Sequence, residues 1–275
     1  YGKKEARNML LYVVTALIVL FLVLPVLIII PMSFSSSRYI EFPPPDFSTR
    51  WYDTFFGSKT WTTALMNSIV IGIATTILAL ILGLLIAEGL NKSHFKGKSF
   101  ITELFMMPML VPGIIVGISL FKFESEIKIS GTLTGLIIAH TVLAIPFVVR
   151  TVLASLSGLN PNYELAAQNL GANKFQTFMK VTFPIIKPAI FSGAMFAFAT
   201  SFDEIVVSQF ICGTRVKTLP KVIWDGLNQQ LDPTITSIAT IMITLITIIM
   251  VLMYAKDIFG KKNKGIPEEM IPEED

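Results

Sequence analysis

The amino-acid sequence predicts an all-α, polytopic membrane protein with six transmembrane helices. Charged residues make up only 15% of the 275 residues, which is too few for a surface that faces water on every side. A helical crossing of the bilayer needs about 20 mostly apolar residues, and six stretches of the chain suit one. Five of them contain no Asp, Glu, Lys or Arg: Asn8–Ser37, Thr60–Ala87, Leu104–Phe121, Ile129–Val149 and Pro233–Ala255.

The first crossing is predicted at Met9–Ile30, after the basic segment Tyr1–Arg7. Its apolar run is far longer than the core of a signal peptide and lacks a small-residue cleavage site, so we expect the helix to be retained. Residues 1–60 then comprise this helix and an extracytoplasmic loop, and residues 61–259 form a core of five helices. The tail at residues 260–275 changes from lysines to acidic residues with two prolines, a pattern that is typical of a disordered end.

The distribution of positive charge predicts the orientation. The turn Asn91–Lys98 contains three lysines and no acidic residue, and such turns lie on the cytoplasmic side of membranes. With six crossings, both termini lie on that side, as does the longest cytoplasmic loop, residues 158–182. Most of the Lys and Arg residues of the chain then face the cytoplasm, as the positive-inside rule requires.

The loop at residues 158–182 has the signals of a helical hairpin. Asn160 is a candidate N-cap, and Pro161 is tolerated at the first position of a helix. Gly171 is suited to end this helix because glycine adopts the left-handed conformation without steric cost. The segment Asn173–Lys180 is then predicted to form a second short helix.

This hairpin has two features that a partner protein could bind. Ala166 and Ala167 form a small-residue patch, and Phe175, Phe178 and Met179 share one face of the second helix. A hairpin that lies on the lipid surface is the alternative interpretation of the same pattern.

The sixth apolar stretch, residues 183–211, is interrupted by Asp203 and Glu204. If the helix enters the membrane near Lys187, a rise of about 1.5 Å per residue places these acids in the outer third of the bilayer. Ionisable groups at this depth usually face a bundle interior or a water-filled path. We expect a continuous helix, on which Glu204 shares a small polar face and is the more solvated acid, whereas Asp203 needs a partner.

Two interpretations of these acids stay open. Asp203 and Glu204, beside the aromatic ring of Phe202, could line the translocation pathway of a cationic substrate through charge pairing and cation–π contact. Alternatively, they could form structural ion pairs that hold this helix to a neighbouring helix or to a second permease.

The sequence also excludes several kinds of site. Cys212 is the only cysteine and His94 and His140 are the only histidines, so neither a disulfide framework nor a Cys/His metal site is expected. We expect His140 to be a neutral, hydrogen-bonded residue within the bundle. The chain has neither a phosphate-binding Gly-x-x-x-x-Gly-Lys-Ser/Thr loop nor a Gly-x-Ser-x-Gly turn, and no catalytic residue is assigned.

The segment Glu164–Gly171, Glu-Leu-Ala-Ala-Gln-Asn-Leu-Gly, followed by Val181 and Pro184, resembles the EAA loop of ABC importer permeases. In that family this loop is the coupling helix, which sits in a cleft of the cytoplasmic ATPase. The sequence departs from the family pattern at one position. In the strict pattern an acidic residue directly precedes the two alanines, whereas here Leu165 occupies that position and Glu164 lies one residue earlier. The residues that the resemblance and the hairpin assign to ATPase coupling are Glu164, Ala166, Ala167, Gly171, Phe175 and Pro184.

Further segments narrow the resemblance to the second permease of spermidine/putrescine uptake systems. It implies a type I ABC importer permease fold in a bacterial inner membrane, a second permease subunit, two copies of an ABC ATPase that bind ATP and Mg, and an extracytoplasmic solute-binding protein. This chain itself would hold no cofactor. The segments are Phe47–Tyr52, Pro108–Pro112, Ala139–Thr141, Ser201–Glu204, Thr218–Pro220 and Asp232–Thr234.

Other functions remain as alternatives. Relatives of this subgroup are associated with opines or phosphonates, so the same architecture could carry a different cargo. A secondary transporter driven by an ion gradient acting on Asp203 and Glu204 is a second alternative. An intramembrane enzyme is a third and has the least support, because the sequence shows no nucleophile–base pair.

Overall fold

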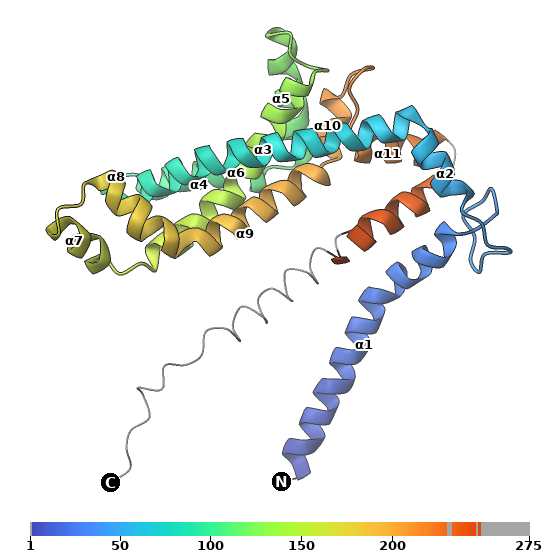
Figure 1. Cartoon of the computed structure of the whole chain (residues 1–275), viewed down its shortest axis with the longest axis horizontal. Coiled ribbons are helices and arrows are strands. Elements are labelled where there is room, and N and C mark those ends of the chain that lie inside the picture. Colours follow the sequence, from blue (N-terminus) through green and yellow to red (C-terminus); the bar gives the residue numbers. More distant parts are fainter. Residues whose placement is uncertain (1, 230–232, 246, 249–275) are drawn as a thin grey trace. The chain divides into compact units, whose positions relative to one another are not determined.

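The computed structural model describes residues 2–229, 233–245 and 247–248, shown in Figure 1. Its regular structure within these ranges is helical, apart from one isolated antiparallel bridge between Ser35 and Phe47. The chain divides into two compact units. One combines residues 1–58 with the residues from 229 onward, and the other comprises residues 59–228.

The first unit contains α1 (Gly2–Ser33) and α2 (Arg50–Gly57). Of α1, Asn8–Ser33 is long and apolar enough to cross a membrane, which agrees with the predicted first crossing. In α2, Trp51 is buried, and its backbone carbonyl accepts a hydrogen bond of 3.3 Å from the hydroxyl of Ser237. Ser237 lies in the short apolar helix Thr234–Leu245. Part of the predicted crossing at Pro233–Ala255 lies outside the described residues. The predicted tail, residues 260–275, lies wholly outside them.

The second unit is built on three long helices that pack side by side, α3 (Lys59–Lys92), α6 (Leu133–Ser157) and α9 (Phe183–Phe202), as Figure 1 shows. Glycines let their backbones come close. A Cβ atom at Gly83 would lie 2.6 Å from the side chain of Val148, and one at Gly193 would lie 2.8 Å from the hydroxyl of Thr151. Such small-residue contacts are the usual basis of helix packing in membranes.

The third predicted crossing is not a straight helix. It is split into α4 (Lys98–Leu110) and α5 (Gly113–Glu126), which meet at an angle of 99°. Pro112 explains the break, because a proline has no N–H and forces the preceding residue into an extended conformation. Val111 adopts that conformation, with φ −79° and ψ 133°. Pro108, by contrast, is accommodated inside α4.

Short helices complete the second unit. The coupling-loop region contains α7 (Asn162–Asn169) and α8 (Lys174–Thr177), followed by a π-helical segment, η1 (Phe178–Thr182). After α9 come α10 (Val206–Ile211) and α11 (Leu219–Gln229). The start of α11 is tied to α3, since the backbone N–H of Leu219 donates to the hydroxyl of Ser68 at 2.8 Å.

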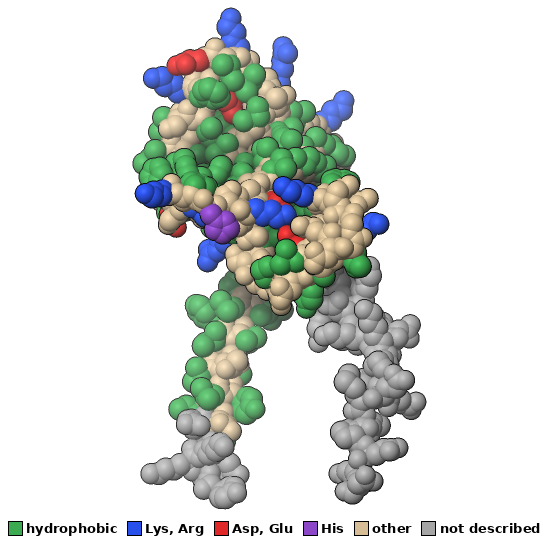
Figure 2. All heavy atoms as spheres, turned by 90° about the vertical axis from the view of Figure 1, so that its left-hand side faces the viewer, with side chains coloured by type: hydrophobic (Ala, Val, Ile, Leu, Met, Phe, Trp, Pro, Cys, Tyr) green, Lys and Arg blue, Asp and Glu red, His purple; other side chains and the backbone are tan. Residues whose placement is uncertain are grey.

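The described residues support four or five of the six predicted crossings. Four helical segments are long and apolar enough, Asn8–Ser33, Lys59–Lys92, Leu133–Ser157 and Lys174–Phe202, and the bent pair α4–α5 is a fifth if it forms one span. Hydrophobic side chains cover much of the molecular surface in Figure 2, as lipid or protein contact requires. The fold is therefore an all-α, polytopic membrane architecture.

Candidate functional site

The helical hairpin predicted in the loop at residues 158–182 is confirmed in its first half. The helix begins one residue later than predicted, with Pro161 at the N-cap, and the side chain of Asn160 accepts a hydrogen bond of 3.0 Å from the N–H of Asn162, the first residue of α7. Gly171 ends the hairpin's first arm with a φ of +89°, in the left-handed region. Its N–H donates to the carbonyl of Gln168 at 2.9 Å, and the N–H of Ala172 donates to the carbonyl of Ala167 at 3.1 Å. These bonds satisfy carbonyls that a helix end would otherwise leave unpaired.

The second half differs from the prediction. Asn173 and Gln176 form a capping box at the start of α8, but the helix does not end near Lys180. It continues through η1 into α9, as one helical segment from Lys174 to Phe202. The prediction of a separate short helix was wrong because the π-helical turn keeps the chain helical where Pro184 cannot donate to the carbonyl of Lys180.

The predicted coupling residues are mostly exposed. None of the α7 residues is buried, and Ala166 lies at the surface, whereas Ala167 is half-buried. The side chains of Leu170 and Phe175 are 90% and 72% exposed. Phe178 instead packs inward against the core of α3, α6 and α9. The hairpin thus presents apolar side chains outward at the loop where the resemblance places the ATPase contact.

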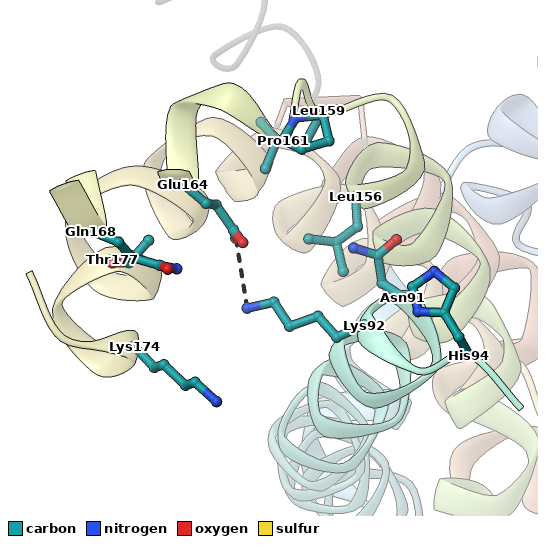
Figure 3. A pocket seen from close by; sticks show the side chains of 10 residues that line it. All are labelled: Asn91, Lys92, His94, Leu156, Leu159, Pro161, Glu164, Gln168, Lys174 and Thr177. Atoms are coloured by element: carbon teal, nitrogen blue, oxygen red, sulfur yellow. Dashed lines mark ion pairs between the residues drawn. The ribbon is translucent and has the colours of Figure 1, made fainter. Parts of the chain in front are cut away.

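Glu164 behaves differently from the other coupling candidates. Its Oε1 atom accepts a hydrogen bond of 2.5 Å from the hydroxyl of Thr182 and lies 3.6 Å from Nζ of Lys92. Lys92 also pairs with Glu88, one turn earlier on α3. Figure 3 shows Glu164 and Lys92 pointing toward each other. The carboxylate of Glu164 therefore contacts its own chain.

The helix that carries the predicted pathway acids is broken at these acids. α9 ends at Phe202, and α10 begins at Val206, so Asp203 and Glu204 lie in the connection. The expectation of a continuous helix with the two acids on adjacent faces was wrong. Asp203 is the C-cap residue of α9, with φ −94° and ψ 1°. An acidic residue is unfavourable at the negative end of a helix dipole, so Asp203 does not stabilise the end of α9. Its presence there has to be explained by something other than helix stability.

The roles of the two acids are also reversed relative to the prediction. Glu204 is half-buried, and its Oε1 atom accepts a hydrogen bond of 2.8 Å from the N–H of Val207 at the start of α10. Asp203 is exposed and forms no ion pair with a described residue. Phe202 is half-buried and stacks on Phe198, with ring centroids 5.6 Å apart. Glu204 therefore accepts a backbone N–H of the first turn of α10 from the position before the N-cap residue, Ile205, while the carboxylate of Asp203 remains accessible.

His140 on α6 spans this break. Its side chain is fully buried, and its Nδ1 atom lies 2.9 Å from the hydroxyl of Ser201 in α9. Its Nε2 atom lies 3.2 Å from the hydroxyl of Ser208 in α10. The expectation of a hydrogen-bonded histidine is confirmed. One side chain thus joins the two helices on either side of Asp203 and Glu204.

We expect His140→Leu to destabilise the protein and to lower transport. The substitution leaves the hydroxyls of Ser201 and Ser208 buried without this partner, at about 1–3 kcal/mol each. The measurement is the thermal unfolding midpoint of the purified complex, together with substrate uptake. His94→Leu is the control, because His94 is exposed. An unfolding midpoint for His140→Leu equal to that of the control would show that these bonds do not hold the break.

Residues 79–263 match the profile of the family described as "Binding-protein-dependent transport system inner membrane component". The chain belongs to this family. The permease is thus a multi-pass inner-membrane component of an ABC transporter, and the expectation that ATP hydrolysis takes place in a partner ATPase is confirmed. The permease itself carries no cofactor, and its transport system includes a binding protein.

Two relatives and one solved structure illustrate the similarity. The permease is 31% identical over 246 residues to the spermidine/putrescine transport system permease protein PotC of Haemophilus influenzae, covering 90% of this chain and 94% of that protein. It is 29% identical to the putrescine transport system permease protein PotI of Escherichia coli, covering 83% and 84%. A crystal structure of a bacterial ABC transporter for alginate import has a TM-score of 0.73 at 17% identity, covering 94% and 98%. This structure supports the ABC importer permease fold.

Several site residues were missed by the sequence reasoning. In the sequence, Lys92 is only one of the three lysines of the turn Asn91–Lys98, and no pattern assigned a hydrogen-bond partner to Thr182, Ser201 or Ser208. Their partners lie far along the chain, 61 residues apart for His140 and Ser201. A polar residue within a long apolar stretch was the only available signal, because such a residue needs a hydrogen-bond partner inside the bundle.

Proposed function

We propose that the permease forms part of an ATP-driven importer of polyamines such as spermidine and putrescine. In this proposal it pairs with a second permease subunit and two copies of the ATPase, and it receives its cargo from the extracytoplasmic binding protein. The observation that carries the substrate class is the broken helix at Asp203. The similarity to permeases named for spermidine and putrescine supports the same substrate class.

The end of α9 has the electrostatics of a cation site. The aligned peptide dipoles of a long helix place partial negative charge at its C-terminus. Asp203 adds a full negative charge at that point, and its carboxylate is exposed. An ammonium group at this point would neutralise the carboxylate of Asp203 and interact favourably with the negative end of the helix dipole. The neighbouring ring of Phe202 is suited to a cation–π contact with the same group. An anionic cargo would be repelled by the same arrangement.

The irregular backbone supports a position along the transport path. Non-helical backbone at membrane depth is tolerated only where protein covers it or where it lines a water-filled cavity. The connection between α9 and α10 is such a segment, directly after the candidate span Lys174–Phe202. His140 and the hydrogen bond from Val207 to Glu204 hold the helices on both sides of it. In the proposal, Asp203 contacts the cargo and Glu204 positions the break.

The exposed hairpin carries the coupling part of the proposal. Leu170 and Phe175 present apolar surface to the solvent, and an exposed apolar patch often marks a protein contact. In the proposal, this surface docks on the ATPase in the cytoplasm, and both termini lie on the same side. Closure of the ATPase dimer on ATP would move the hairpin and rock the helices. Figure 2 faces the hairpin and shows several Lys and Arg side chains near it, which a cytoplasmic position favours.

Uptake of labelled substrates tests the substrate class. Cells that lack their own polyamine uptake and express the permease with its transport partners are expected to accumulate spermidine or putrescine. Excess unlabelled polyamine should abolish this uptake, whereas an alkylphosphonate or an opine should not compete. Accumulation of the phosphonate or the opine without polyamine uptake would refute the polyamine proposal and leave the permease assignment intact.

A further inference from the structure

The helix α7 is weakly attached to the helices of the second unit. None of its residues is buried, and its backbone neighbours are mainly α8 and η1, the segments that follow it in the chain. A cavity of about 350 Å³ separates α7 from the ends of α3 and α6 (Figure 3). The lining residues used below are Lys92 from α3, Glu164 from α7 and Lys174 from α8. Packing alone therefore does not couple α7 to α3.

One ion pair crosses this cavity. Nζ of Lys92, at the last residue of α3, lies 3.6 Å from Oε1 of Glu164. Glu88 holds the lysine from the α3 side, four residues earlier, which directs its ammonium group toward α7. Figure 3 shows the two side chains extended toward each other, while Lys174 points elsewhere. The carboxylate of Glu164 also accepts the hydrogen bond from Thr182.

The second contact of Glu164, with Thr182, lies directly before the long helix α9. Thr182 is fully buried and is the last residue of the π-helical segment before α9. Glu164 therefore joins α7 to two different membrane helices, to α3 through Lys92 and to the start of α9 through Thr182. Glu164 contacts neither the exposed apolar surface of the hairpin nor Asp203.

We propose that the Lys92–Glu164 pair is the link that transmits movement of the hairpin to α3. Lys92 and Glu164 are positioning residues, which touch neither the ATPase nor the cargo. This inference rests on the proposed coupling function of the hairpin. Because the side chain of Lys92 is 45% exposed, the ion pair is screened by solvent and contributes little to folding stability, so breaking it should leave the complex intact and change the transport obtained per ATP.

A charge-exchange cycle tests the link in the complete transporter. Lys92→Glu places three carboxylates together and should drive α7 away from α3, and Glu164→Lys should set two ammonium groups against each other. Each single variant is expected to lower spermidine uptake per ATP hydrolysed by about tenfold, within the range of known coupling effects. The double variant restores opposite charges and is expected to recover uptake per ATP to within about twofold. Lys96→Glu, a charge change at an exposed lysine of the neighbouring turn, is the control.

Two further variants separate this link from the docking proposal. Leu170→Asp and Phe175→Asp should reduce co-purification of the ATPase, whereas Lys92→Glu should not. Normal ATPase retention in both Asp variants would refute docking at this surface. If the Asp variants lose the ATPase but Lys92→Glu and Glu164→Lys have normal uptake per ATP, the docking proposal stands. The proposal that the Lys92–Glu164 pair transmits movement is then wrong. A double variant no better than the worse single variant would overturn it as well.

Discussion

Gly171→Val is expected to lower ATP-driven uptake by more than about tenfold while the protein stays folded in the membrane. Gly171 has a φ of +89°, and a left-handed conformation costs a residue with a side chain about 1–2 kcal/mol, more for a β-branched one. A Cβ atom at this position meets nothing within 4 Å, so the effect comes from the backbone alone. The strained turn should change the angle between α7 and α8 and misplace the docking surface.

Matched substitutions isolate this backbone effect. Gly171→Asn should retain most of the transport, because asparagine tolerates the left-handed conformation better than other residues with side chains. Gly158→Ala, at a nearby glycine with a φ of −86°, should behave as the parent protein. Uptake and ATP hydrolysis are measured in the same preparation. Equal activity of Gly171→Val and Gly171→Asn would mean that the turn geometry does not govern coupling.

Asp203→Asn is expected to reduce spermidine uptake by about tenfold or more, with ATP hydrolysis less affected. The substitution removes the charge at the C-terminus of α9 that the proposal assigns to the cargo, and charge-assisted contacts are about twice as strong as neutral ones. Asp203→Glu keeps the charge and should retain substantial uptake. The measurement is the concentration dependence of labelled spermidine uptake, because a lost cargo contact weakens apparent affinity.

Variants of Glu204 distinguish a positioning role from a place in the transport path. Glu204→Gln keeps a side-chain oxygen that can accept the hydrogen bond from Val207, so its effect on folding should be small. Glu204→Leu removes the acceptor of the Val207 N–H, a hydrogen bond typically worth about 1 kcal/mol, and should lower the unfolding midpoint as well as uptake. Normal spermidine uptake in Asp203→Asn would remove Asp203 from the transport path, whereas normal uptake in Glu204→Gln is the expected result for a residue that only positions the break.

Local signals along the chain predicted much of the fold. Uncharged stretches placed the long helices, since the energetic cost of charge in lipid leaves a clear pattern. Asn160 and Gly171 marked the ends of α7 to within about two residues, because capping depends on the conformation of a few adjacent residues. Pro112 is a local signal of the same kind, although the crossing at Leu104–Phe121 was predicted without the bend that the structure has there.

Features that depend on distant contacts could not be predicted in this way. The assignment of helix faces at Asp203 and Glu204 assumed an unbroken helix, and the break depends on how α6 and α10 meet the end of α9. His140 holds both sides of that break through serines 61 and 68 residues away. The inward orientation of Glu164 likewise depends on Lys92 at the end of another helix. Periodicity within one segment carries no information about such partners.

The most direct test of the central claim is spermidine uptake by proteoliposomes that contain the permease, its second permease and its ATPase. We expect uptake that requires both ATP inside, on the ATPase side, and the loaded binding protein outside, with ATP hydrolysis rising when the binding protein is added. Vesicles that contain the permease alone should take up none, with or without an ion gradient. ATP-independent uptake by the permease alone, driven by an ion gradient, would contradict the account and establish a secondary transporter.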